Sequence, residues 1–142
     1  MDKKILPNEI LLGEVAAVLR EGREAVIIPT GSSMLPFIHG GRDRVVLCAR
    51  PAVSVGDIVL VRIGEQYLLH RVIAVDGDAL TLMGDGNLAG TERCTVADVI
   101  GTVVEIIRPS GRHIRPGKGR LWRILRPLRR YLLGIYRRFI RL

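Results

Sequence analysis

The sequence lacks any apolar run of about 18 residues, so it contains no conventional transmembrane helix. Its first 15 residues, MDKKILPNEILLGEV, mix charged residues with a proline before an apolar segment can form, and we read no secretory signal there. The chain has two cysteines, Cys48 and Cys94, without a CxxC spacing, and we expect reduced thiols rather than a disulfide. These features lead us to expect a cytoplasmic protein.

Aromatic residues are also scarce, at 4% of the chain, whereas 48% of the residues are apolar. A core made mainly of Val, Ile and Leu favours strands over helices. With 142 residues, the chain is long enough for one domain with a real core and hardly long enough for two.

Acidic residues are missing from the end of the chain. Residues 108–142 hold 12 Lys and Arg and no Asp or Glu, whereas residues 1–107 hold 10 basic and 14 acidic residues. The net charge of +8 therefore belongs to a strongly basic tail on a mildly acidic body, and the tail needs an explanation of its own.

The hydrophobic pattern predicts one short amphipathic helix within residues 7–22, followed by strands. Six short segments rich in β-branched residues are bounded by Gly, Pro or Asp, at 24–30, 43–49, 57–63, 67–75, 79–83 and 101–107. Asp76-Gly77 predicts a hairpin between two of them. We therefore expect a compact, mostly antiparallel β domain over residues 1–108, a linker over 109–119 and a basic amphipathic helix over 120–142.

Lysine, a common partner of catalytic serines, is limited to Lys3, Lys4 and Lys118, all outside the predicted β body. His70 lies within a predicted strand and is either a buried core histidine or a positioned base. Asp85, in the stretch LMGDGN, is either a turn residue or the carboxylate that orients this histidine. The residues taken singly leave both questions open.

Several motifs occur together and in order. TGSSMLPFI resembles the nucleophile box of the signal peptidase I family, and GDIVLVR resembles the strand that follows it. YLLHRVIAVDGD resembles the strand that carries the base, in the endoplasmic-reticulum type with His in place of Lys. MGDGN and ADVIGTVV resemble the acidic box and the closing strand, so that the resemblance covers about residues 24–107. It implies a signal-peptidase/LexA-like β fold with an N-terminal helix and a serine endopeptidase that cleaves an extended segment of a precursor peptide or protein.

The resemblance also implies a role for individual residues, and it calls for no metal or cofactor. A histidine suits the role of base, because an imidazole is mostly neutral at pH 7 and needs only to be oriented. The implied roles are nucleophile for Ser33, general base for His70, orienting carboxylate for Asp85, oxyanion hole for the backbone N–H groups of Ser32 and Ser33, and substrate binding for Met34 and Pro36. Glu92, a few residues after the acidic box, is the alternative to Asp85 as the carboxylate that orients His70.

Two other functions are compatible with the same motifs. A LexA-like self-cleaving regulator would share the core, but its lysine is absent here, and the Ala89-Gly90 pair follows the serine instead of preceding it. A non-catalytic module could use the same cleft to recruit peptides to a membrane.

The basic tail shows a helical stripe of apolar residues flanked by arginines, a pattern that favours the surface of an anionic membrane. Docking on a protein partner or on the chain's own domain is the alternative, and nucleic acid is disfavoured because the stripe is wider than phosphate binding requires. We therefore expect a peripheral protein on the inner face of the membrane. The expected membrane-binding residues are Trp122, Arg123, Arg126, Arg129, Arg130, Tyr131, Arg137, Arg138 and Phe139.

Overall fold

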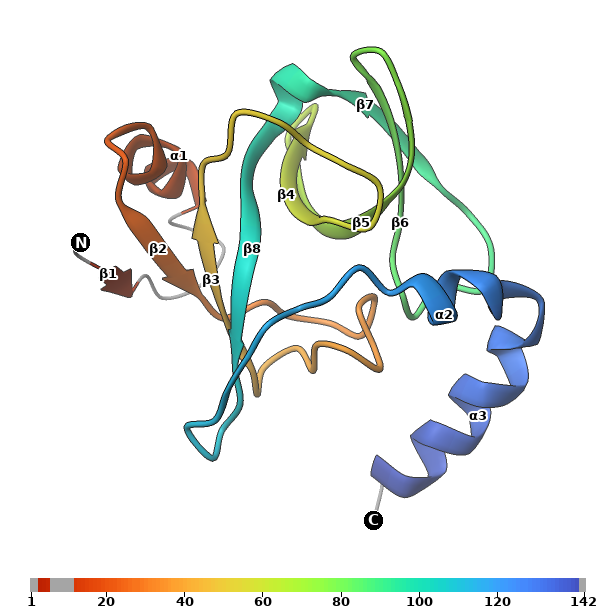
Figure 1. The fold of residues 1–142 in the computed structure, drawn as a ribbon. Helices are drawn as coiled ribbons and strands as arrows, with labels where there is room; N and C mark the ends of the chain where they lie inside the picture. Colours follow the sequence, from red (N-terminus) through yellow and green to blue (C-terminus); the bar gives the residue numbers. More distant parts are fainter. Residues whose placement is uncertain (1–2, 6–11, 141–142) are drawn as a thin grey trace.

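A computed structural model of the chain describes residues 3–5 and 12–140 (Figure 1). The described strands form one curled sheet, and their bounds are β1 Lys3–Ile5, β2 Glu24–Ile27, β3 Arg44–Cys48, β4 Ile58–Ile63, β5 Gln66–Asp76, β6 Ala79–Met83, β7 Glu92–Thr95, β8 Val99–Ile107 and β9 His113–Ile114. Their order across the sheet is β1-β2-β3-β8-β4-β5-β6-β7, and β9 pairs with β8. All described pairs are antiparallel except β1 with β2. The expected mainly β fold is therefore confirmed.

Six of the strands, β2 to β6 and β8, coincide with the segments predicted from the sequence, with ends that differ by a few residues. The pairing of β5 with β6 confirms the hairpin, whose turn residues are Gly77 and Asp78. Strands β1, β7 and β9 escaped prediction because two to four residues are too few to show an alternation. Helix α1, Leu12–Arg20, lies within the predicted helical segment, whose residues 7–11 fall outside the described part.

Strand β4 is buried on both faces, which explains its unbroken apolar sequence. Ile58 and Leu60 point into the core cluster that α1 covers. Val59 and Val61 point into a second cluster, which contains residues of β5, β6 and β7. The sheet curls around this second cluster, as the bend of β4 and β5 in Figure 1 shows. Because of this curl, both faces of β4 are shielded from solvent.

The segment over 109–119, expected as a linker, is attached to the body along its length. β9 extends the sheet beside β8. The backbone oxygen of Gly117 accepts a hydrogen bond from Arg71 at 3.0 Å. The Lys118 ammonium forms a salt bridge with Asp57 and donates a hydrogen bond to Ser54 at 2.8 Å. These contacts make the segment part of the same packed unit as the strands.

The predicted single helix over the tail is divided into three pieces: α2 Arg120–Ile124, a 3₁₀ helix Arg126–Leu128, and α3 Arg129–Ile140. Pro127 lies at the division, since proline has no N–H to donate and its ring disfavours a helix interior. No helix within the described residues has the length and apolarity needed to cross a bilayer.

One side of the tail packs against the body. The Trp122 indole N–H donates to the backbone oxygen of Asp85 at 2.8 Å, and its ring meets Phe37 edge-on with centroids 6.2 Å apart. Further along, Tyr136 and His39 share a hydrogen bond between hydroxyl and ring nitrogen. Burial raises the pKa of Tyr136, so its hydroxyl keeps its proton in this contact.

Arg129, the first residue of α3, is buried as well, at 2% exposure. Its guanidinium donates to the backbone oxygen of Asn87 at 3.1 Å and lies over the Trp122 ring at 5.1 Å from the centroid. Burial lowers the pKa of Arg129. The expectation that Trp122 and Arg129 bind a membrane is therefore corrected: both side chains attach the tail to the body.

The packing of the tail gives a first prediction. Leu133 is 1% exposed, whereas Ile135, two residues away on the same helix, is 56% exposed. Leu133→Ala should lower the free energy of unfolding by about 2–5 kcal/mol, because it leaves a cavity in a close-packed site. The matched Ile135→Ala should change it by less than about 0.5 kcal/mol. Urea denaturation measures both, and equal values would contradict the packing of α3 on the body.

Candidate active site

A cleft of about 660 Å³ opens between the end of β2, the first half of β5 and the loop over residues 28–43 that joins β2 to β3, here called the serine loop. Its walls are largely apolar and include Ile27, Leu60 and Leu69. Ser33 and His70, predicted as nucleophile and base, both line it. The fold thus brings together two residues that are 37 positions apart in the sequence.

Ser33 lines this cleft, whereas the neighbouring Ser32 does not line it and is exposed to solvent. Met34 also lines the cleft and is anchored in the core at 4% exposure. Pro36, expected at the substrate site, follows a cis peptide bond and is absent from the described lining residues. In the described part of the chain the Ser33 hydroxyl makes no hydrogen bond. This does not count against a catalytic role, because hydrogen bonds between catalytic groups are often long until substrate binds.

A glycine-rich turn over residues 84–87 lies directly against the serine loop. The Gly86 N–H donates to the backbone oxygen of Ser33 at 2.7 Å. A Cβ atom on Gly84 would lie 2.4 Å from the Ser33 oxygen, and one on Gly86 would lie 2.4 Å from the Ser32 oxygen. Glycine is therefore required at both positions so that the two backbones can approach. The MGDGN motif holds the serine loop in place.

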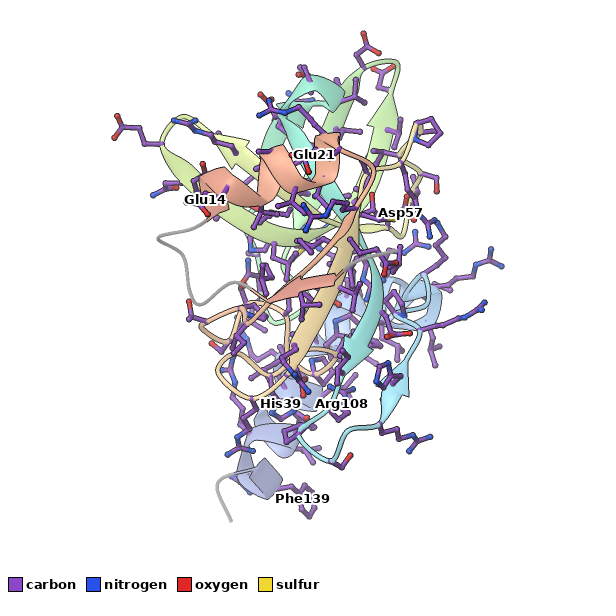
Figure 2. The ribbon with its side chains drawn as sticks, turned by 90° about the vertical axis from the view of Figure 1, so that its left-hand side faces the viewer. Glu14, Glu21, His39, Asp57, Arg108 and Phe139 are labelled. Carbon is purple, nitrogen blue, oxygen red and sulfur yellow. The ribbon has the colours of Figure 1, made fainter. Side chains whose placement is uncertain are left out.

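The far end of the serine loop is fixed by charge. Asp43, at 1% exposure, accepts hydrogen bonds from the Arg108 guanidinium at 2.5 Å and from the His39 N–H at 2.8 Å. Arg108 also donates to the backbone oxygen of Phe37 at 3.0 Å. Figure 2 labels His39 and Arg108 in this lower part of the molecule. The serine loop is thus held at both ends, and a nucleophile on it would be rigidly placed.

His70 is 5% exposed, and its Nδ1 atom lies 2.5 Å from Oε1 of Glu92 on β7. The strand register explains this contact. Val72 pairs with Leu82 and Leu82 pairs with Glu92, so their side chains share one face of the sheet. His70 lies two residues before Val72 and points to that same face. The contact fixes the imidazole ring, with its Nε2 atom directed away from Glu92.

Asp85 does not orient His70, contrary to the expectation from the sequence. Its carboxylate is 1% exposed and accepts two hydrogen bonds from Arg71, from Nε at 2.9 Å and from Nη2 at 2.8 Å. Arg71 is completely buried. The carboxylate beside His70 is that of Glu92, and Asp85 instead completes a buried ion pair.

A β-bulge in β5 causes this exchange of partners. The register that begins the hairpin places Asp76 opposite Ala79, and if it continued it would bring Asp85 opposite His70. The bulge, which follows residue 72, moves the register by one residue. Because a shift of one residue moves side chains to the other face, Asp85 meets Arg71 instead.

Arg71 uses its remaining groups to connect further segments. Nη1 donates to the backbone oxygens of Gly56 at 2.9 Å and Gly117 at 3.0 Å. The guanidinium also lies over the Phe37 ring of the serine loop, at 5.0 Å from the centroid. A single buried cation therefore links β5, the glycine-rich turn that carries Asp85, the serine loop and the segment over 109–119.

Comparisons with known proteins add no family to this description: no protein-family model matches the chain, and a search of curated proteins finds no match.

Of two residues at the site, the sequence left one, Glu92, as an open alternative to Asp85 and missed the other, Arg71. Glu92 lies 22 positions beyond His70, and no spacing rule connects them without the register of three strands. Arg71 carried a signal that could have been used, because a charged residue inside an apolar strand must find a partner. Asp85, near the end of the neighbouring predicted strand, was a candidate for that partner.

The buried pair gives a second prediction. Arg71→Met should lower the free energy of unfolding by about 3–5 kcal/mol, because it leaves the Asp85 carboxylate buried and unpaired. The double variant Arg71→Met, Asp85→Leu should recover much of this loss. Arg23→Met, which breaks an exposed pair with Glu21, is the matched control and should cost about 1 kcal/mol or less. Urea denaturation of all three variants tests this, and equal losses for the two single variants would contradict it.

Proposed function

We propose that this chain is a serine endopeptidase that cleaves an extended segment of a precursor peptide or protein, with Ser33 as nucleophile and His70 as general base. One observation carries the proposal: Ser33 and His70 line the same cleft, and the Nδ1 atom of His70 is hydrogen-bonded to Glu92, which leaves Nε2 for a proton transfer. This is the set of roles that a serine–histidine–carboxylate triad requires, with Glu92 in place of the expected Asp85.

In the proposed reaction, His70 takes the proton of the Ser33 hydroxyl through Nε2 while the oxygen attacks the scissile carbonyl. The Glu92 carboxylate accepts a hydrogen bond from Nδ1–H and stabilises the imidazolium that forms. His70 then gives the proton to the leaving amine as the C–N bond breaks, which leaves an acyl ester on Ser33. A water molecule, deprotonated by His70, hydrolyses this ester and restores the serine.

The negative charge on the carbonyl oxygen needs donors in fixed positions. In the described part of the chain, the N–H groups of Ser32 and Ser33 donate to no protein acceptor. Their carbonyl groups, by contrast, accept from Leu35 at 3.2 Å and from Gly86 at 2.7 Å. These bonds hold the peptide units in place and leave the two N–H groups for the substrate, which supports the proposed oxyanion hole.

The edge of β5 supports an extended substrate. In the described structure, residues 66–70 pair with β4 on one side, while β6 pairs only with residues 71–76 on the other. A peptide could therefore add as a strand along the unpaired edge, where main-chain hydrogen bonds give affinity and alternate side chains enter pockets. The apolar walls at Ile27, Met34 and Leu69 favour apolar substrate side chains.

We further propose the cytoplasmic side of a membrane as the place of this activity. Both Cys48 and Cys94 are free thiols. Cys94 is buried, and burial, followed by the charge of Asp98, raises the pKa of its thiol and so lowers its reactivity. Two unpaired thiols fit a reducing compartment.

A third prediction identifies the nucleophile. A fluorophosphonate probe should label the wild-type chain on Ser33, and Ser33→Ala should abolish labelling and peptide cleavage. Ser32→Ala is the matched control and should keep both, because Ser32 lies outside the cleft. Both variants should retain their stability to within about 1 kcal/mol. Intact-mass spectrometry measures labelling, and a folded wild-type chain that takes no label would favour a non-catalytic peptide-binding module.

A fourth prediction concerns the carboxylate. Glu92→Gln should lower the rate of acylation by a factor on the order of 10²–10⁴, because the ring loses its orientation and the stabilisation of its charged form. Glu105→Gln is a matched control, since Glu105 contacts the ring of His113, a histidine outside the described cleft lining. Single-turnover labelling measures both rates. An acylation rate for Glu92→Gln equal to that of Glu105→Gln would remove Glu92 from the mechanism.

A further inference from the structure

The tail has an outer face that the body leaves uncovered. Among the described residues, six large apolar side chains are more than half exposed, and all six belong to the tail: Leu121 at 69%, Ile124 at 68%, Leu128 at 51%, Tyr131 at 69%, Ile135 at 56% and Phe139 at 69%. We call these six residues the outer tail face. Figure 2 labels Phe139 at the lower end of the molecule, beyond His39 and Arg108.

The helix geometry separates this face from the side that packs on the body. Tyr131, Ile135 and Phe139 recur every four residues and so lie on one side of α3. Leu133, at 1% exposure, and Tyr136, bonded to His39, lie on the other side. The docking of the tail on its own domain therefore uses different residues and leaves the outer tail face without a partner in the described structure.

Positive charge borders the outer tail face. Arg126 and Arg130 are exposed and, with Leu88, Pro127 and Tyr131, line a cavity of about 410 Å³. Leu88, itself 46% exposed, extends the apolar surface onto the loop that follows the glycine-rich turn. No acidic residue occurs in residues 108–142 to neutralise these arginines along the chain.

We propose that the outer tail face binds the surface of an anionic membrane, with its apolar side chains among the acyl chains and its arginines at the lipid phosphates. Exposed apolar side chains, three of them on one side of α3, with arginines at their border match the two layers of a lipid interface. A nucleic acid offers phosphates but no apolar layer, and an ordinary protein partner does not need uniform positive charge. The cavity between Arg126 and Arg130 has the charge and the apolar edge that a lipid headgroup requires.

The inner side of the tail gives this binding a consequence for the cleft. Trp122 and Arg129 hold the glycine-rich turn through Asp85 and Asn87, and Tyr136 holds the serine loop through His39. A membrane bound on the outer side therefore fixes the position of the cleft relative to the lipid surface, so that substrates at that surface would meet it in one orientation.

The test is vesicle flotation with the full chain. Vesicles of phosphatidylglycerol and phosphatidylcholine in equal parts should carry the wild-type chain, and vesicles of phosphatidylcholine alone should carry little. Arg126→Gln, Arg130→Gln should weaken partition by roughly 30-fold at low salt, about fivefold for each arginine. The matched control Arg20→Gln, Arg93→Gln has the same net charge and exposed sites on α1 and β7, and it should bind like wild type.

A second pair of variants tests the apolar part of the outer tail face. Ile135→Glu, Phe139→Glu should abolish flotation. Val75→Glu, Val96→Glu introduces the same charges at exposed apolar residues, on β5 near its hairpin turn and on the 3₁₀ helix after β7. Figure 1 shows these segments at the opposite end of the molecule from α3. This control should float nearly as well as wild type.

Thermal unfolding and fluorophosphonate labelling of each variant show that it is folded, and neither readout depends on vesicles. Three results would overturn the proposal. One is equal flotation of the tail variants and their controls. Another is a change of oligomeric state in Ile135→Glu, Phe139→Glu without loss of flotation, which would assign the face to a second copy of the chain. The last is wild-type binding to an oligonucleotide but not to anionic vesicles.

Discussion

The ion pair between Arg71 and Asp85 is the contact on which the site depends. It is buried completely, and a charge placed there without its partner would cost several kcal/mol, on the order of 3–5. Because Arg71 also binds the backbone of two distant segments and the Phe37 ring, the pair joins the cleft strand, the glycine-rich turn, the serine loop and the segment before the tail. The position of Ser33 follows from this junction, since the glycine-rich turn lies against the serine loop and is bonded to it through the Gly86 N–H.

Strand β5 also explains why Glu92 and Asp85 have different partners. His70 and Arg71 are neighbours, and alternation along β5 sends them to opposite faces. Each face supplies one carboxylate, Glu92 for the imidazole and Asp85 for the guanidinium. Glu92 therefore takes part in the proposed reaction, whereas Asp85 stabilises the fold, and neither carboxylate has to do both.

Sequence reasoning found six of the described strands and, among the residues that line the cleft, Ser33 and His70, because β-branched runs and the serine and histidine motifs are local features. It assigned Asp85 to His70 because the resemblance implies an orienting carboxylate in the acidic box. A regular hairpin would place the two residues opposite each other, and the bulge that prevents this leaves no clear mark in VIAVDGDAL. Glu92 depends on the registers of two strand pairs, which no local pattern encodes. The tail was read as one amphipathic helix, but Trp122 and Arg129 pack inward because a tryptophan N–H and a guanidinium can satisfy buried carbonyl oxygens.

The inward contacts of the tail have a consequence for the order in which the protein is made. Residues 120–140 leave the ribosome after the serine loop and the glycine-rich turn that they hold. Until they emerge, Asp85 lacks the indole that binds its backbone oxygen, and the carbonyl of Asn87 lacks its guanidinium. The serine loop and the glycine-rich turn would therefore gain their full set of contacts only after residues 120–140 have been made.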